Sequence, residues 1–191
     1  MQNDPALLKV AERSPSCAAW SPCAHRPQLL ATGSLQGMLS DDFQSSAFVE
    51  IWDASKTSSA APQELVSLCK FPAPACFSKL AWSPVGSDSG KHPLGILAGG
   101  MQDGSLCLWD PQRAIDQQDA QLHTQKVHTM AVADLHFHPR QAHFLASVGG
   151  AKLMLWDVQN AESPVVRPFQ EQAEASNASL TTVRWNPQKD C

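Results

Sequence analysis

The sequence predicts an all-β fold built from one four-stranded unit that is repeated along the chain. Three alternating apolar segments of the 191-residue chain end in Trp-Asp, and a Leu-Ala run precedes each of them. An aromatic residue two positions before a proline opens each unit. Alternation of apolar and polar residues is typical of a half-buried strand. The chain has six Trp and no Tyr, and we expect the repeat to account for this.

The motifs recur in the same order in each unit. The Trp-Asp pairs are Trp52-Asp53, Trp109-Asp110 and Trp156-Asp157, and the opening aromatics are Trp20, Trp82, Phe137 and, for a fourth time, Trp185. The step from the Leu of Leu-Ala to the Trp is 12 residues in the second unit and 11 in the third, but 22 in the first. The first unit therefore carries an insertion of about ten residues between the same two strands.

This repeat resembles that of the WD-repeat β-propeller family. The resemblance rests on the three Trp-Asp pairs, on the turn around Asp103, and on the segment that runs from His128 to Phe137. It implies four-stranded blades that bury their apolar faces against each other, with Trp52, Trp109 and Trp156 packed between blades. We expect a partial propeller: blade one over about 15–71, blade two over 74–123, blade three over 126–170, and the first strand of a fourth over 178–187.

Members of this family often connect a histidine, a Ser or Thr, a turn Asp and the Trp in a buried hydrogen-bond network. Blade three has His128, Ser147 and Trp156 but Gly150 at the position of the turn Asp. Blade two has Asp103 and Trp109, with Gly99 and Ala73 replacing the other two members. For blade one the pattern offers Trp52 alone. Because partly satisfied networks stabilise poorly, we expect the blades to depend mainly on apolar packing.

A narrower resemblance extends from about residue 10 to 187. It is carried by Ala18–Pro22 before Leu30–Gly33, by the long hairpin Met38–Phe43 before Val49–Ile51, by Lys79–Trp82 before Gly95–Gly100, and by His123-Thr124 before Trp156–Asn160. In these stretches the chain resembles the N-terminal propeller of the large outer-cage subunit of the COPII vesicle coat (the Sec-thirty-one type). Seven blades would need roughly 280 residues, so we expect this chain to correspond to part of such a propeller.

The composition excludes several other classes of protein. With 18 acidic and 14 basic residues the formal net charge is −4, so no basic field attracts nucleic acid or an anionic membrane. No apolar run is long enough to span a bilayer, and no signal peptide is visible. The six cysteines form no CxxC pair, which argues against a zinc ribbon or a thioredoxin-type site and favours free thiols.

We find no pattern that predicts a catalytic, cofactor or metal site. Five histidines fall within 21 residues (His123, His128, His136, His138 and His143), but no cysteine or paired carboxylate lies beside them at a zinc-ligand spacing. We therefore interpret them as structural or solvent-facing. The stretch Ser87–Gly90 has Asp88 at its centre, where a nucleophile elbow requires serine, and a flexible hairpin loop is expected there.

The resemblance implies a non-catalytic scaffold of a COPII-like coat that supports outer-cage assembly between the endoplasmic reticulum and the Golgi. Its implied partners are the smaller WD-repeat outer-coat subunit and other coat copies, with membrane contact only through the coat. It implies a cytoplasmic location, on coated vesicles and at endoplasmic reticulum exit sites. The alternative is a WD-repeat adaptor for another complex, such as a ubiquitin-ligase receptor or a chromatin subunit. A propeller hydrolase is disfavoured because no positioned acid, base or nucleophile set is present.

Overall fold

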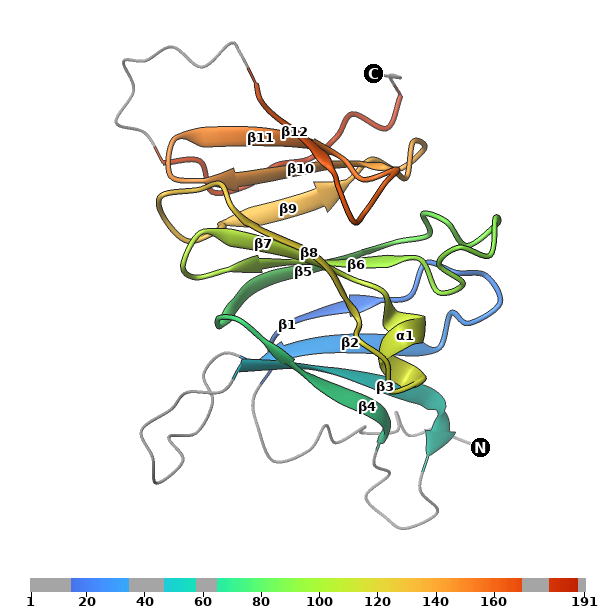
Figure 1. Ribbon diagram of the computed structural model, residues 1–191. Coiled ribbons are helices and arrows are strands. Elements are labelled where there is room, and N and C mark those ends of the chain that lie inside the picture. The colour runs from blue at the N-terminus through green and yellow to red at the C-terminus, as the bar shows by residue number, and fades with distance from the viewer. Residues whose placement is uncertain (1–14, 35–46, 58–64, 170–178, 189–191) are drawn as a thin grey trace, which may run out of the picture.

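The computed structural model describes residues 15–34, 47–57, 65–169 and 179–188, and these form three stacked four-stranded antiparallel sheets (Figure 1). The first sheet contains β1 (Pro15–Trp20), β2 (Leu29–Ser34), β3 (Ala47–Thr57) and β4 (Leu65–Ala73). The second contains β5 (Phe77–Ser83), β6 (Ile96–Met101), β7 (Ser105–Trp109) and β8 (Gln121–Lys126), with the short helix α1 (Pro111–Ile115) between β7 and β8. The third contains β9 (Asp134–Phe137), β10 (Phe144–Gly149), β11 (Lys152–Asp157) and β12 (Val165–Pro168). The all-β partial propeller predicted from the sequence is confirmed.

Each sheet is a meander, because every strand pairs antiparallel with the next strand along the chain. The first strands of the sheets contact one another in chain order, β1 with β5 and β5 with β9. The three sheets, which we call blades one to three, therefore stack from the blue and teal sheet to the orange one (Figure 1). Direct connections between neighbouring strands allow this arrangement, since antiparallel neighbours need no crossover.

Two apolar clusters fill the spaces between the blades. Between blades one and two lie Leu29, Ala31, Val49, Ile51, Phe77, Leu80, Trp82 and Trp109. Between blades two and three lie Ile96, Ala98, Leu106, Leu108, Leu135, Leu145 and Trp156. Successive residues of β7 enter opposite clusters, because side chains alternate between the faces of a strand. Blade two is thus buried on both faces.

The β6–β7 hairpin is closed by Gly104. Its φ of +87° is left-handed, a conformation that glycine adopts without steric cost. A Cβ at this position would lie 2.2 Å from the His128 carbonyl oxygen, so the close approach of the next blade also requires glycine. Asp103 accepts hydrogen bonds from the Ser105 amide (2.9 Å) and hydroxyl (2.6 Å), which holds the turn in place.

The fourth blade's first strand, expected over 178–187, is not formed in the described part of that segment. Residues 179–188 contain no strand. The segment instead lies against β9, with the Trp185 indole nitrogen donating to the His136 carbonyl (2.7 Å). The physical reason is that a strand requires a hydrogen-bonded ladder with a neighbour, and the described residues hold no following strand for it to pair with.

Residues 84–95 form a loop between β5 and β6, where the sequence predicts a hairpin loop. Hydrogen bonds within the loop join its backbone groups. The Ser87 amide donates to the Pro84 carbonyl (3.0 Å), and the Gly95 amide donates to the His92 carbonyl (2.8 Å). The buried His92 ring bonds Asp110 through Nδ1 (2.8 Å). The His92–Asp110 contact attaches this loop to the end of β7.

Candidate functional site

The repeat positions form one cross-strand row in each blade. The rows are Trp20–Leu30–Trp52, Trp82–Leu97–Trp109 and Phe137–Leu145–Trp156, read from the first strand to the third. Residues directly opposite each other on neighbouring strands share a face of the sheet. Each row therefore presents its aromatics to the same side, and in blades two and three that side faces the preceding blade.

The Trp residues at the ends of these rows are buried. Trp52, Trp109 and Trp156 are 4%, 1% and 0% exposed. Trp109 packs against Phe77 of its own blade and Phe71 of blade one, with ring centroids 5.8 and 6.1 Å away. Gly99 makes room for it, since a Cβ there would lie 2.7 Å from both Trp109 and Phe77. The glycine that replaces serine in blade two thus serves aromatic packing.

Blade three brings His128, Ser147 and Trp156 together. The Ser147 hydroxyl accepts from the Trp156 indole nitrogen (2.9 Å) and lies 2.9 Å from His128 Nε2. Burial lowers the pKa of His128 below its usual range, which favours the neutral ring. The arrangement ties the loop before β9 to the third strand of the same blade.

Blade one has a partner that the sequence reading missed. Trp52 was expected to stand alone, but its indole nitrogen donates to the Thr32 hydroxyl at 2.9 Å. Thr32 is on β2, as Ser147 is on β10. Thr32 follows Leu30 by two positions, as Ser147 follows Leu145, so the Leu-Ala motif itself carried the signal for this contact. The expectation for blade one was therefore wrong.

The aspartates that follow Trp hold the chain as it leaves the third strand. Asp53 accepts from the Ser55 amide (2.9 Å), Asp157 accepts from the Gln159 amide (3.0 Å), and Asp110 caps α1 through the amides of Gln112 (2.9 Å) and Arg113 (3.2 Å). Short acidic side chains suit this role because they reach backbone amides two or three residues ahead.

The residue before the proline of each aromatic-x-Pro motif also bonds a backbone amide ahead of it, and the sequence analysis did not predict this role. In each motif the side chain before proline accepts a hydrogen bond from the backbone amide two residues further on. The distances are 3.2–3.4 Å for Ser21, Ser83 and His138, and 2.9 Å for Asn186. The signal was a polar side chain before proline, repeated four times. It identifies a turn motif that starts the loop after β1, β5 and β9 and recurs in the 179–188 segment.

The opening aromatics differ in their burial. Trp82 is 7% exposed and its indole nitrogen donates to the Leu94 carbonyl (2.7 Å). Trp185 lies against His138, with ring centroids 4.9 Å apart. Trp20 is 57% exposed, although it has the same position in its row as Trp82. The described residues contain no blade in front of blade one to cover it.

Asp134 joins blade two, blade three and the 179–188 segment. It accepts from the Thr182 hydroxyl (2.8 Å), the Val183 amide (3.1 Å) and the Arg184 guanidinium, and it lies 3.4 Å from the Lys79 ammonium. Burial by itself would raise the pKa of this carboxyl, but the hydrogen bonds and the Lys79 charge together lower it below its ordinary value. Asp134 is thus ionised and holds the segment onto β9.

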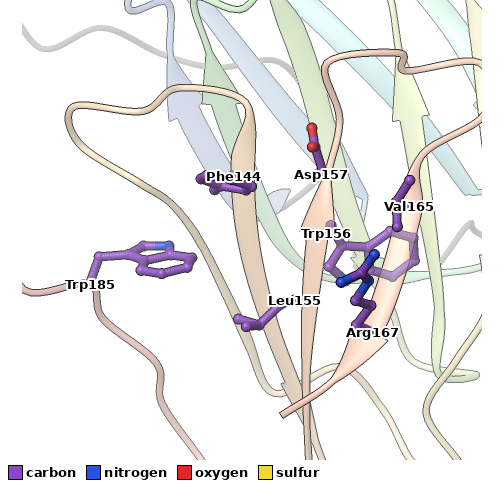
Figure 2. Close-up of a pocket in the computed structure, with 7 residues that line it drawn as sticks. All are labelled: Phe144, Leu155, Trp156, Asp157, Val165, Arg167 and Trp185. Atoms are coloured by element: carbon purple, nitrogen blue, oxygen red, sulfur yellow. The ribbon is translucent and has the colours of Figure 1, made fainter. Parts of the chain in front are cut away.

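The side of blade three that faces away from blade two is partly open. A cavity of about 420 Å³ lies there between Phe144, Leu155, Val165, Arg167 and Trp185 (Figure 2). In this view Trp185 stands on one side and Val165 and Arg167 on the other. Leu155 and Val165 are only partly covered. The lining is mostly apolar, as at an inter-blade face.

The described residues hold no cluster of metal-ligating side chains. No group of three or more His, Cys, Asp or Glu side chains in them could hold a metal ion. The described cysteines are free, and burial raises the pKa of Cys69 and Cys107 to about 11. Thiols with such values are poor nucleophiles. Within the same residues, no helix is long and apolar enough to cross a membrane.

Comparison with known proteins adds a family to this geometry. No protein-family model matches the chain. Protein transport protein sec31 of Neurospora crassa is 35% identical over 147 residues, which is 76% of this chain and 11% of that protein. The protein of the same name from Aspergillus oryzae is 34% identical over 172 residues, 88% of this chain and 13% of that protein. A structural match is found to a chain in a crystal structure of a mitotic checkpoint complex, with a TM-score of 0.59 and 20% sequence identity. The match covers 90% of this chain and 40% of that chain. At that identity it supports the fold alone.

The sequence similarity and the stacked sheets agree with each other. The similarity to the sec31 proteins extends over most of the chain, and the three blades carry the repeated rows that a propeller needs. The chain is therefore a WD-repeat β-propeller segment of the Sec31 type, and it spans 11–13% of the length of the sec31 proteins it matches.

Proposed function

We propose that the chain is a non-catalytic scaffold module of a COPII-like vesicle coat, where it supports outer-cage assembly for transport from the endoplasmic reticulum to the Golgi. The observation that carries this proposal is the similarity to protein transport proteins named sec31 over three quarters or more of the chain. Because the chain spans 11–13% of those proteins, the proposal concerns the propeller part of the coat subunit.

The architecture supports a structural role. Polar groups at several repeat positions bond neighbouring backbone or side chains within the fold, as Asp110 and Ser147 do. What remains for partners is the outer surface of a rigid stack and its loops, which is where repeat proteins bind. Individual contacts of this kind are weak, and a lattice strengthens them through multivalency.

The proposed partners are the smaller WD-repeat outer-coat subunit and other copies of the coat protein. The proposed location is cytoplasmic, at endoplasmic reticulum exit sites and on coated vesicles, with membrane contact only through the coat. An adaptor role in a ubiquitin ligase or a chromatin complex would use the same fold, but the similarity to transport proteins favours the coat.

Immunoprecipitation from cell extract tests this proposal. An antibody raised against residues 112–126, which are mostly exposed or partly exposed, should recover coat subunits, and immunofluorescence should place the antigen at exit sites. Preincubating the antibody with its peptide is the control and should abolish both signals. Recovery of ubiquitin-ligase or chromatin subunits without coat subunits would contradict the coat role and favour the adaptor.

A further inference from the structure

A polar cleft of about 450 Å³ opens where loops of all three blades meet. Each of these loops joins the first strand of a blade to its second, and in Figure 1 they lie at the right-hand side of the stack. The cleft is lined by Pro22, Cys23, His25, Pro84, Asp88 and His143, among others. Its volume is within the range of small-ligand and peptide pockets.

Hydrogen bonds fix the walls of the cleft before anything binds. The Ser83 hydroxyl donates to the Ala142 carbonyl at 2.7 Å and so connects the loop of blade two to that of blade three. Ser21 receives the Cys23 amide at 3.3 Å, and the His92–Asp110 contact anchors the loop that carries Asp88. A preformed site loses little conformational entropy on binding.

The chemistry of the lining favours a positively charged group. Asp88 is exposed and is the one carboxylate among the described residues that line the cleft, and these residues include no Lys or Arg. Pro22 and Pro84 supply apolar ring surface close to this carboxylate. Lysine and arginine combine an aliphatic stem with a charged end, so their side chains match both features.

Covalent capture does not suit this cleft. Cys23 is 3% exposed, and burial raises the pKa of its thiol. A protonated, covered thiol reacts slowly. Binding in this place is therefore a matter of shape, hydrogen bonds and charge.

We propose that the cleft binds a segment of a partner protein that presents a lysine or arginine side chain, with its stem on Pro22 and Pro84 and its charge beside Asp88. The proposal goes beyond the coat role, since it requires only the three loops and holds in any complex that contains this chain.

Amide chemical shifts of the isotope-labelled chain test the proposal. The probe is an N-acetylated pentapeptide amide with arginine at its centre and alanine elsewhere, compared with the same peptide carrying glutamate. The arginine peptide should shift residues 22–25, 84–88 and 142–143 in a saturable way, and the glutamate peptide should not. Asp88→Asn should weaken binding about threefold to fivefold, as expected for an exposed charge pair.

Two further variants sharpen the result. Ala24→Arg should abolish binding, because the chain's own guanidinium would fill the cleft. Asp116→Asn removes an exposed carboxylate that does not line the cleft and should bind like the parent chain. Equal binding of both peptides, shifts confined to other regions, or unchanged affinity in Asp88→Asn would each overturn the proposal.

Discussion

Blades two and three carry the same motif but differ in how deeply it is buried. The third strand of blade two, β7, is buried at all five positions. In β11, its equivalent in blade three, only Trp156 is buried, and the other positions are partly or fully exposed. β7 has a blade on each side, whereas the described residues place a blade on one side of β11 only. Burial of a repeat therefore depends on its neighbours as much as on its own residues.

The largest expected effect comes from the centre of the inter-blade packing. Trp109→Ala should lower the free energy of unfolding by about 3–5 kcal/mol, because a buried indole between two blades is lost. Thermal or urea unfolding followed by circular dichroism measures it. Trp20→Ala, which removes an exposed indole, is the control and should stay within about 0.5 kcal/mol. If the two variants had the same free energy of unfolding, the assigned role of the rows in inter-blade packing would be wrong.

A matched pair of leucines tests the comparison directly. Leu108 and Leu155 each precede the repeat Trp, and Leu108 is 0% exposed while Leu155 is partly exposed. Leu108→Ala should cost about 2–5 kcal/mol, and Leu155→Ala markedly less. Equal losses in urea unfolding would show that the outer side of β11 is covered as fully as β7.

Removing the Ser147 hydroxyl should lower the free energy of unfolding by about 1–3 kcal/mol. Two buried nitrogens, on His128 and Trp156, would lose this hydroxyl as their common hydrogen-bond partner. Ser147→Ala is measured by the same unfolding curves. Thr32→Val is the matched change in blade one and should cost less, since the Trp52 nitrogen is its one buried side-chain donor. A neutral Ser147→Ala would mean that apolar packing alone holds this row.

The smallest expected effect is local and depends on pH. Asp134→Asn should reduce hydrogen-exchange protection of residues 180–185 about tenfold, a loss of about 1.4 kcal/mol, because the ion pairs to Lys79 and Arg184 disappear. The pKa of Asp134 is lowered in the folded chain, so its stabilisation is complete above its ordinary pKa and is lost as the pH falls through the folded pKa.

The parent chain should therefore keep the segment protected from pH 7 down to about 4 and release it at lower pH. The Asn variant should show no such step. Asp116→Asn, at an exposed carboxylate elsewhere, should behave like the parent. A parent profile without the acid step would argue against Asp134 as the anchor.

Much of the fold could be predicted because its signals are local. Trp-Asp at the end of an alternating run predicts a third strand and its cap, and Asp53, Asp110 and Asp157 all bond amides just ahead of them. The Thr32 contact to Trp52 was missed although the Leu-Ala motif places Thr32 at the position of Ser147. The contact between His92 and Asp110 that holds the 84–95 loop had no local signal, because the two residues are distant in sequence.

The sequence by itself determined the repeat, the number of complete sheets and the positions of the buried indoles, because strand alternation and turn chemistry act over a few residues. The tertiary structure decided which faces are covered, as the contrast between Trp20 and Trp82 shows. It also decided whether residues 179–188 form a strand and where loops of three blades enclose a cleft. These features depend on which surfaces meet, and burial arises only when distant segments pack together.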